Sequence, residues 1–245
     1  MPHRLAPAFA VGALLLAVHA SPPASAQGYT QFNRWCYGEA TPARTIQGCD
    51  AVIRWARETP RDTGTAFYNR GLALAATGQL DRAIQDYGQA IRLKPDLADA
   101  YNNRGIAWRL KGDDARALED FDQALRLKSD DVDALYNRGL ALMGLGQYDK
   151  AIAGFDAALR LKPDDVDAVA ARGMAWLRKG DSGRALQDFD QVLGVRPGNV
   201  IALYGRGIAR RRTGNHKGGD ADIAAAKALQ PDIADEFARM GLSAS

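Results

Sequence analysis

The most regularly spaced polar residues in this chain belong to the string Asn-Arg-Gly. It occurs at 69–71, 103–105 and 137–139, and arginine followed by glycine returns at 172–173 and 206–207. An arginine offers five N–H donors in a planar fork, and an asparagine amide is both a donor and an acceptor. Such groups can bind the carboxylates or peptide groups of a partner, or they can hold packed helices together.

The arginines share a 34-residue period with a column of acidic residues. The arginines are Arg70, Arg104, Arg138, Arg172 and Arg206, and the acidic residues are Asp86, Asp120, Asp188 and Asp222, with Gly154 interrupting the column. We expect each arginine to lay its stem along the core and to pair with acidic or carbonyl groups between helices. The alternative is an arginine ladder that binds a ligand, with the guanidinium groups pointing freely into a groove.

Residues suited to catalysis are sparse. Outside residues 1–26 the only histidine is His216. The patterns of hydrolase nucleophiles, zinc proteases and phosphate-binding loops are absent from the sequence. The pairs Asp130–Asp131 and Asp164–Asp165 fall at expected helix starts. The helix dipole stabilises negatively charged side chains at this end of a helix. We therefore expect a protein that is not an enzyme and that needs no cofactor and no metal.

The same period also orders small and apolar residues, and it predicts the elements that position the polar ones. In the first unit, Gly78 can end one helix in a left-handed conformation, and Pro95 ends a second amphipathic helix. Small residues such as Gly71 and Ala83 allow two helix backbones to approach closely. We expect the aromatic column that begins at Tyr87 to pack across the next unit.

These columns resemble the signature of the tetratricopeptide repeat (TPR) family. The chain also has an expected export signal and a cysteine pair, both described below, and with them it resembles a bacterial branch of that family. The resemblance implies an all-α fold, an open right-handed superhelical solenoid of helix–turn–helix units. Five units are expected, at 64–97, 98–131, 132–165, 166–199 and, divergent, 200–233. An N-terminal cap or degenerate repeat is expected at 27–63, with 58–64 as its connection, and a capping helix and tail at 234–245.

In this family the first helix of each unit lines a concave surface, which binds peptides in some members. The resemblance implies that the asparagines of the recurring string hold the backbone of an extended peptide. Hydrogen bonds between packed helices are the alternative, and the sequence leaves both open. The expected partner-binding groove consists of Tyr68, Asn69, Asn102, Asn103, Tyr136, Asn137 and Tyr204.

The expected function is a non-enzymatic protein–protein interaction module of the bacterial cell envelope. It would bind a peptide segment or a partner helix of an unidentified protein. One alternative is a structural scaffold that docks through its convex face or its ends.

A second alternative is an anionic partner bound by a basic patch near the C-terminus. The patch consists of Arg206, Arg210, Arg211, Arg212 and Lys217, and a solvated helix face is its other interpretation. The formal net charge of +3 is too small to indicate a nucleic-acid partner.

The N-terminus is typical of an export signal. Arg4 precedes an apolar run at 5–20, and Ala24-Ser25-Ala26 forms a cleavage site before Gln27. The run is shorter than the roughly 20 residues of a membrane-spanning helix, so we expect cleavage of residues 1–26 and a periplasmic or secreted chain without a membrane span. In an exported protein Cys36 and Cys49 are expected to form a disulfide, with two buried free thiols as the alternative.

Overall fold

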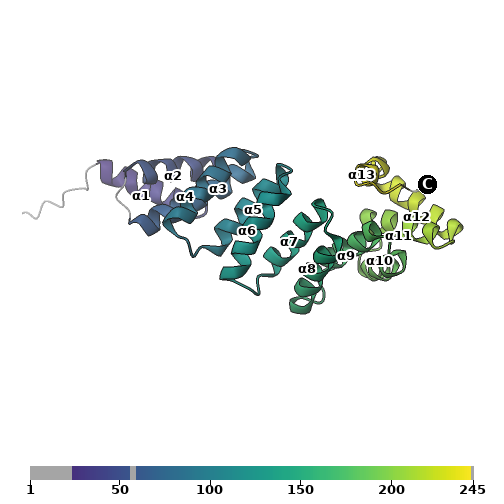
Figure 1. Cartoon of the computed structure of the whole chain (residues 1–245). Coiled ribbons are helices and arrows are strands. Elements are labelled where there is room, and N and C mark those ends of the chain that lie inside the picture. The colour runs from purple at the N-terminus through teal and green to yellow at the C-terminus, as the bar shows by residue number, and fades with distance from the viewer. Residues whose placement is uncertain (1–23, 56–58, 244–245) are drawn as a thin grey trace, which may run out of the picture.

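The computed structural model describes residues 24–55 and 59–243, and within these ranges it contains helices and no strands. The predicted signal peptide therefore lies mostly outside the described residues, and the expected cleavage site between Ala26 and Gln27 falls in the first turn of α1. The helices follow one another along a curved array (Figure 1). They are α1 (Ala24–Tyr37), α2 (Pro42–Trp55), α3 (Pro60–Ala76), α4 (Leu80–Leu93), α5 (Ala98–Leu110), α6 (Asp114–Leu127), α7 (Val132–Gly144), α8 (Tyr148–Leu161), α9 (Val166–Lys179), α10 (Ser182–Val195), α11 (Val200–Arg212), α12 (His216–Leu229) and α13 (Ile233–Arg239).

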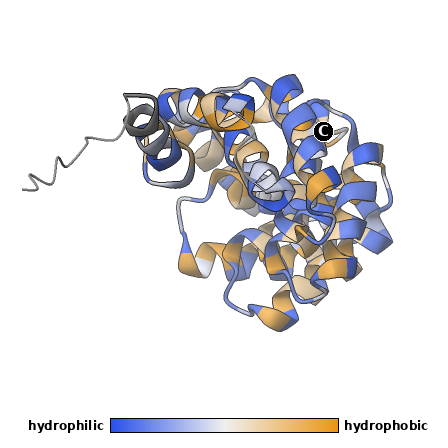
Figure 2. Ribbon diagram, turned by 90° about the vertical axis from the view of Figure 1, so that its left-hand side faces the viewer, coloured by the Kyte–Doolittle hydropathy of each residue, from blue (hydrophilic) through white to orange (hydrophobic). Residues whose placement is uncertain are grey.

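Consecutive helices pack in pairs, and each pair stacks on the next. The first helices of neighbouring pairs, such as α5 and α7, also contact each other directly. The second helices, such as α6 and α8, make no such direct contact in the described part of the chain. The array is therefore narrower on the first-helix side, which makes that side concave and the second-helix side convex. This arrangement confirms the expected helical repeat solenoid. Hydrophobic and hydrophilic residues alternate along its helices (Figure 2).

The glycine that follows each first helix has the expected left-handed conformation. Its φ angle lies between 72° and 93° in every unit, at Gly78, Gly112, Gly146, Gly180 and Gly214. A side chain would be strained at such an angle, so glycine lets the chain turn sharply into the second helix.

The other glycine column seats an aromatic ring of the same unit. A Cβ atom added to Gly139 would lie 2.5 Å from Cε1 of Phe155, and one added to Gly105 would lie 2.7 Å from Cε1 of Phe121. The expectation that the rings pack across the next unit was therefore incomplete, because the main seat is within the unit. Phe189 does both, since its Cζ would lie 2.5 Å from a Cβ at Gly205 of the next unit.

The N-terminal residues form a helix pair of their own. α1 and α2 are joined by a disulfide between Cys36 and Cys49, with an S–S distance of 2.11 Å, which confirms the predicted bond. α2 packs on α3 and so continues the stack. The connection expected at 58–64 is mostly helical instead. Thr59 caps α3 by accepting a hydrogen bond from the Asp62 amide, and Pro60 suits the first helical position, so the helix begins before Gly64.

The C-terminal end of the array is covered by α13. Its residues Ile233 and Phe237 are fully buried, and the Phe237 ring lies 4.6 Å from that of Tyr204 in α11. The terminal unit would otherwise expose its apolar face, so a short amphipathic helix closes the core. No helix of the described chain is both long enough and apolar enough to cross a bilayer.

Two glycines in one unit provide a matched test of the ring seat. Gly139→Ala is expected to destabilise the array by about 1–2 kcal/mol, because overpacking against Phe155 outweighs the gain in helix propensity. Gly154→Ala is the control, because the nearest atom to its Cβ would be 3.6 Å away. The control should be neutral or stabilising by up to about 1 kcal/mol. Urea unfolding followed by circular dichroism measures both, and equal destabilisation would contradict the proposed seat.

Candidate functional site

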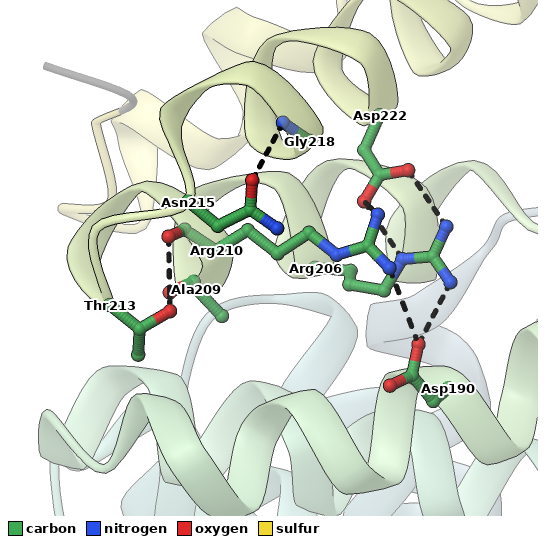
Figure 3. A network of polar contacts seen from close by, with 8 residues as sticks. All are labelled: Asp190, Arg206, Ala209, Arg210, Thr213, Asn215, Gly218 and Asp222. Carbon is green, nitrogen blue, oxygen red and sulfur yellow. Dashed lines mark hydrogen bonds and ion pairs between the residues drawn. The ribbon is translucent and has the colours of Figure 1, made fainter.

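The recurring arginines lie at the joints between units, each held by aspartates of two second helices. Nε and Nη2 of Arg172 donate to Asp188 of its own unit at 3.0 and 2.6 Å. Nη1 donates to Asp156 of the preceding unit at 2.7 Å. Arg206 repeats this arrangement with Asp222 and Asp190 (Figure 3). At the first joint Arg70 pairs with Asp86 and, in α2, with Asp50.

Two joints have only one of the two carboxylates. Arg104 makes the bidentate pair with Asp120 of its own unit, but the position on the preceding second helix is Gly88. Arg138 pairs with Asp122 of the preceding unit at 2.6 Å, because its own unit has Gly154 in the acidic column. The gap at Gly154 was expected from the sequence. The second acidic column, of Asp122, Asp156 and Asp190, was not predicted, although its 34-residue spacing is visible in the sequence.

Burial sets the electrostatics of these joints. Asp120 and Asp188 are each only 5% exposed. Burial raises the pKa of both carboxyls, and the hydrogen-bonded arginines oppose that rise. The pKa of the Arg172 guanidinium is raised, chiefly by its hydrogen bond to Asp188. The arginines are therefore engaged in ion pairs between helices, which confirms the structural interpretation over a freely exposed ligand-binding ladder.

The asparagine column connects first helices across the joints on the concave side. Each amide nitrogen donates to a group one unit earlier: Asn69 to the Cys36 carbonyl at 3.0 Å, Asn103 to the Tyr68 hydroxyl at 3.1 Å, and Asn137 to Oδ1 of Asn102 at 3.3 Å. These bonds show the helix-packing role that the sequence left open. Within the described chain no protein group donates to the Oδ1 atoms of Asn69, Asn103 and Asn137, so acceptors remain along this surface.

Cavities lie at two points along the first-helix side. One of about 240 Å³ is lined by Tyr136, Ala170, Met174 and residues of the next unit that include Ile201. The ring of Tyr136 rests against Phe155 at 5.8 Å, and burial raises the pKa of its hydroxyl.

The other cavity, of about 340 Å³, lies at the N-terminal end beside the disulfide. Asn69, Leu72 and the loop after α1 line it, and Leu72 is 38% exposed. The structure therefore brings most of the predicted groove residues onto one surface, with a hollow near each end of it.

Tyr204 is a correction to the predicted groove. Its side chain is only 3% exposed, because Phe237 of α13 packs against it. The residue has the position of Tyr68 and Tyr136 in its unit, but the capping helix occupies the space where a partner would lie. The accessible groove consequently ends at the start of the fifth unit, where Ile201 lines the cavity beside Tyr136.

The predicted basic patch is also largely corrected. Arg206 and Arg210 both donate to Asp222, and Arg206 also reaches Asp190 (Figure 3). Arg211 pairs with Asp220, and Arg212 donates to the Leu177 carbonyl. Only Lys217, exposed on α12, carries a charge that no hydrogen bond or ion pair in the described chain engages. Asp190, Asp220 and Asp222 thus offset part of the charge of the cluster, which reduces its attraction for an anionic partner.

Comparison with known proteins identifies the repeats. One TPR-repeat family profile matches residues 71–110, and two tetratricopeptide-repeat profiles match 103–176 and 170–233. The chain belongs to the tetratricopeptide repeat family, and it is a protein–protein interaction module of that family's kind. No curated protein matches the sequence significantly.

Solved structures share the fold over most of the chain. YrrB, described as a TPR protein with an unusual peptide-binding site, is 26% identical, superposes with a TM-score of 0.63, and the match covers 76% of this chain and 94% of YrrB. A TPR protein from Parabacteroides merdae superposes with a TM-score of 0.70 at 20% identity, over 88% of this chain and 93% of its own. MamA gives a TM-score of 0.63 at 20% identity, over 71% of this chain and 95% of its own. The last two likenesses show the fold alone.

The joint at Arg172 predicts a stability change with a defined pH dependence. Arg172→Leu leaves the buried Asp188 carboxylate without its main partner and should cost roughly 3 kcal/mol at neutral pH. Without the arginine the pKa of Asp188 rises further, so lowering the pH protonates the stranded carboxylate and recovers part of the loss. Urea unfolding at neutral and mildly acidic pH measures both effects.

The control for this joint is Arg196→Leu. It breaks the exposed pair with Asp167, in which both side chains are more than half exposed, and should cost less than about 1 kcal/mol. A loss in Arg172→Leu no larger than in this control, or one independent of pH, would contradict the assigned role of the joint.

Proposed function

We propose that the chain captures a peptide segment of a partner protein in the concave groove formed by the first helices of its first four units. The observation that carries this proposal is the row of asparagine and tyrosine side chains between the two cavities of that surface. The amide oxygens of Asn69, Asn103 and Asn137 are acceptors that suit peptide N–H groups without selecting a side chain. The cavities supply apolar walls for side chains of the peptide.

The cavity beside Tyr136 suits a side chain of such a peptide. The cavity beside Tyr136 combines apolar Ala170 and Met174 with the hydroxyl of the tyrosine, for which no hydrogen bond with a described residue is found. Tyrosine and methionine together can contact an apolar or aromatic side chain while the hydroxyl bonds to its backbone. YrrB, at 26% identity, supports a peptide ligand, because that TPR protein has a peptide-binding site.

The same proposal includes export to the periplasm or beyond. The leader with its Ala24-Ser25-Ala26 site supports it. The disulfide between Cys36 and Cys49 supports it as well, because such bonds persist in oxidising compartments and are rare in the cytosol. Its partner would then be another protein of the bacterial cell envelope.

A peptide library tests the groove even though the partner is unidentified. Phage-displayed peptides are selected on the oxidised chain, and the affinity of selected peptides is measured by fluorescence anisotropy. Tyr136→Ala, which removes one wall of the cavity, should weaken binding about tenfold or more, as expected for a buried aromatic anchor. Ala170→Arg should do the same by filling the cavity.

The matched control is Ala153→Arg, which places the same side chain on the exposed surface of α8. Binding by this variant should stay within about twofold of the parent, because its charge lies outside the groove. Circular dichroism verifies that each variant keeps its helices. Selected peptides that bind the groove variants and the parent equally, or a failure to select any peptide, would contradict the groove proposal.

Export is tested by expressing the full chain in a Gram-negative host. The mature protein should be found in the periplasmic fraction, begin at Gln27 and have no free thiols. Ala26→Arg should leave the precursor uncleaved, because the cleavage site requires a small residue there. A cytoplasmic chain that keeps its leader and its free thiols would refute this part of the proposal.

A further inference from the structure

The cavity beside Tyr136 has one charged residue in its wall, Asp167. The cavity beside the disulfide has no charged residue in its wall, so Asp167 is the only one that lines either of these two described cavities. Asp167 lies in the first turn of α9, three residues before Ala170 of the same cavity. It pairs with Arg196 at 2.7 Å, and its side chain is 62% exposed. The charged group of these cavities is therefore an accessible carboxylate.

The two preceding units have an aspartate at the same position. Asp99 in α5 and Asp133 in α7 are exposed, and neither makes an ion pair with a described residue. Each lies three residues before a predicted groove residue, Asn102 in one unit and Tyr136 in the other. Residues three apart share one face of a helix, so these aspartates lie on the groove side of their helices. Together with Asp167 they form an acidic row along the groove.

The charge of the acidic row reaches the tyrosines of the groove. Burial raises the pKa of the Tyr68 hydroxyl, and Asp99 of the next unit raises that pKa further. Burial and then Asp167 raise the pKa of Tyr136 in the same way, and Arg109 opposes this rise more weakly than Asp167 adds to it. The charged residue with the largest effect on each tyrosine is therefore an aspartate of the row.

Aspartates outnumber cations in the connections that carry the acidic row. These connections hold eight aspartates and three lysines, at 94–99, 128–133 and 162–167. Two arginines of flanking segments, Arg61 and Arg196, pair with aspartates of these connections. Even with these five cations the aspartates are in excess, so this edge of the groove carries a net negative charge.

Lys128 shows how the charges are shared at one connection. Its ammonium group donates to Asp131 at 3.0 Å, and this hydrogen bond is the main reason that its pKa is raised. Asp99 and Asp130 raise the pKa of the lysine further. Lys162 repeats this arrangement one unit later. One lysine thus faces three carboxylates, and its hydrogen bond is not made to the aspartate of the acidic row.

We propose that the peptide bound in the concave groove is basic, with lysine or arginine side chains placed against Asp99, Asp133 and Asp167. An apolar or aromatic side chain of the same peptide fills the cavity beside Tyr136. This inference rests on the proposed function, because it states the chemistry of the peptide that the groove would bind. Complementary charge then selects among peptides whose backbones the asparagines bind alike.

The spacing of the units sets the spacing of the basic residues. Packed helices lie about 8–10 Å apart, and an extended chain advances about 3.3 Å per residue. Basic residues about three positions apart in the peptide would therefore face successive aspartates of the acidic row.

The peptides selected on the oxidised chain provide the probe. Those whose binding requires Tyr136 should contain more lysine and arginine than the unselected library, and added salt should weaken their binding. The double variant Asp99→Asn/Asp133→Asn should bind them about fivefold more weakly at low ionic strength, as expected when two exposed ion pairs are lost. Fluorescence anisotropy measures the affinities, and circular dichroism verifies that the variant keeps its helices.

The matched control removes the same charge outside the groove. Glu119→Gln/Asp232→Asn neutralises two exposed carboxylates that make no ion pair with a described residue, one on α6 and one just before α13. Its affinity for the selected peptides should stay within about twofold of the parent, because both positions lie away from the acidic row.

A second control changes the peptide. In this neutral peptide every lysine and arginine of a selected peptide is replaced by glutamine. It should bind the parent and Asp99→Asn/Asp133→Asn with equal affinity, because the interaction with the acidic row is then already missing.

Three outcomes would overturn the inference and leave the groove proposal standing. They are Tyr136-dependent peptides without an excess of basic residues, an equal loss of affinity in the control double variant, and a neutral peptide that distinguishes the parent from Asp99→Asn/Asp133→Asn as strongly as the basic one does. If no peptide is selected, or if the selected peptides bind Tyr136→Ala as they bind the parent, the proposed function fails and this inference fails with it.

Discussion

The contact between an aromatic ring and a helical glycine sets the geometry of each helix pair. In the third unit the ring of Phe155 occupies the volume that a side chain on Gly139 would need. The backbone of the first helix can therefore approach the second closely, while the fully buried ring fills the space between them. Because a single pair cannot cover its remaining apolar faces, this one contact commits the chain to stacking. The concave and convex surfaces both follow from how those identical pairs are placed.

Stacking of apolar faces alone does not specify the register between pairs. The arginine joints do so, because a pair displaced along its neighbour would leave a buried carboxylate such as Asp188 without its guanidinium. Buried ion pairs contribute little net stability compared with apolar residues, but breaking one costs several kcal/mol. The asparagine bonds on the concave side add a second constraint between first helices. In the first three units the two kinds of bond hold the joint on two sides, which keeps the surfaces of these units aligned.

The sequence alone was sufficient for most of the features that repeat. The glycine turn at Gly78, the helix starts at Asp131 and Asp165, and the pairing of the recurring arginines all depend on local spacing, and the structure contains them. Two repeating features were missed, the second acidic column and the packing of each ring within its own unit. The other failures depend on contacts that do not repeat. Tyr204 has a groove position by its register, and it is buried only because Phe237 of the terminal helix folds over it.

The basic run near the C-terminus was misinterpreted for a related reason. Read along the chain, Arg206 and Arg210 are an excess of positive charge, but in space they converge on Asp222 of the next helix. Charge counted in a short window of sequence therefore overstates the field of a helical repeat, in which the neutralising residue comes from another helix.

A repeat array separates its surfaces in a way that a compact domain does not. First helices supply the concave side and second helices the convex side. A departure from the repeat pattern, such as Gly88 where later units have an aspartate, alters only the joint that it faces. The departures from the repeat pattern are consequently informative. Where an aspartate is replaced by glycine beside a held arginine, the chain lacks an internal ion pair that it keeps at the first joint and at the last two. At these two adjacent joints Nη1 of Arg104 and both Nη atoms of Arg138 have no acceptor among the described residues, while the concave side keeps its asparagine contacts across the same two joints. The side chains of the two surfaces can thus differ from unit to unit while the packing of the helix pairs stays the same.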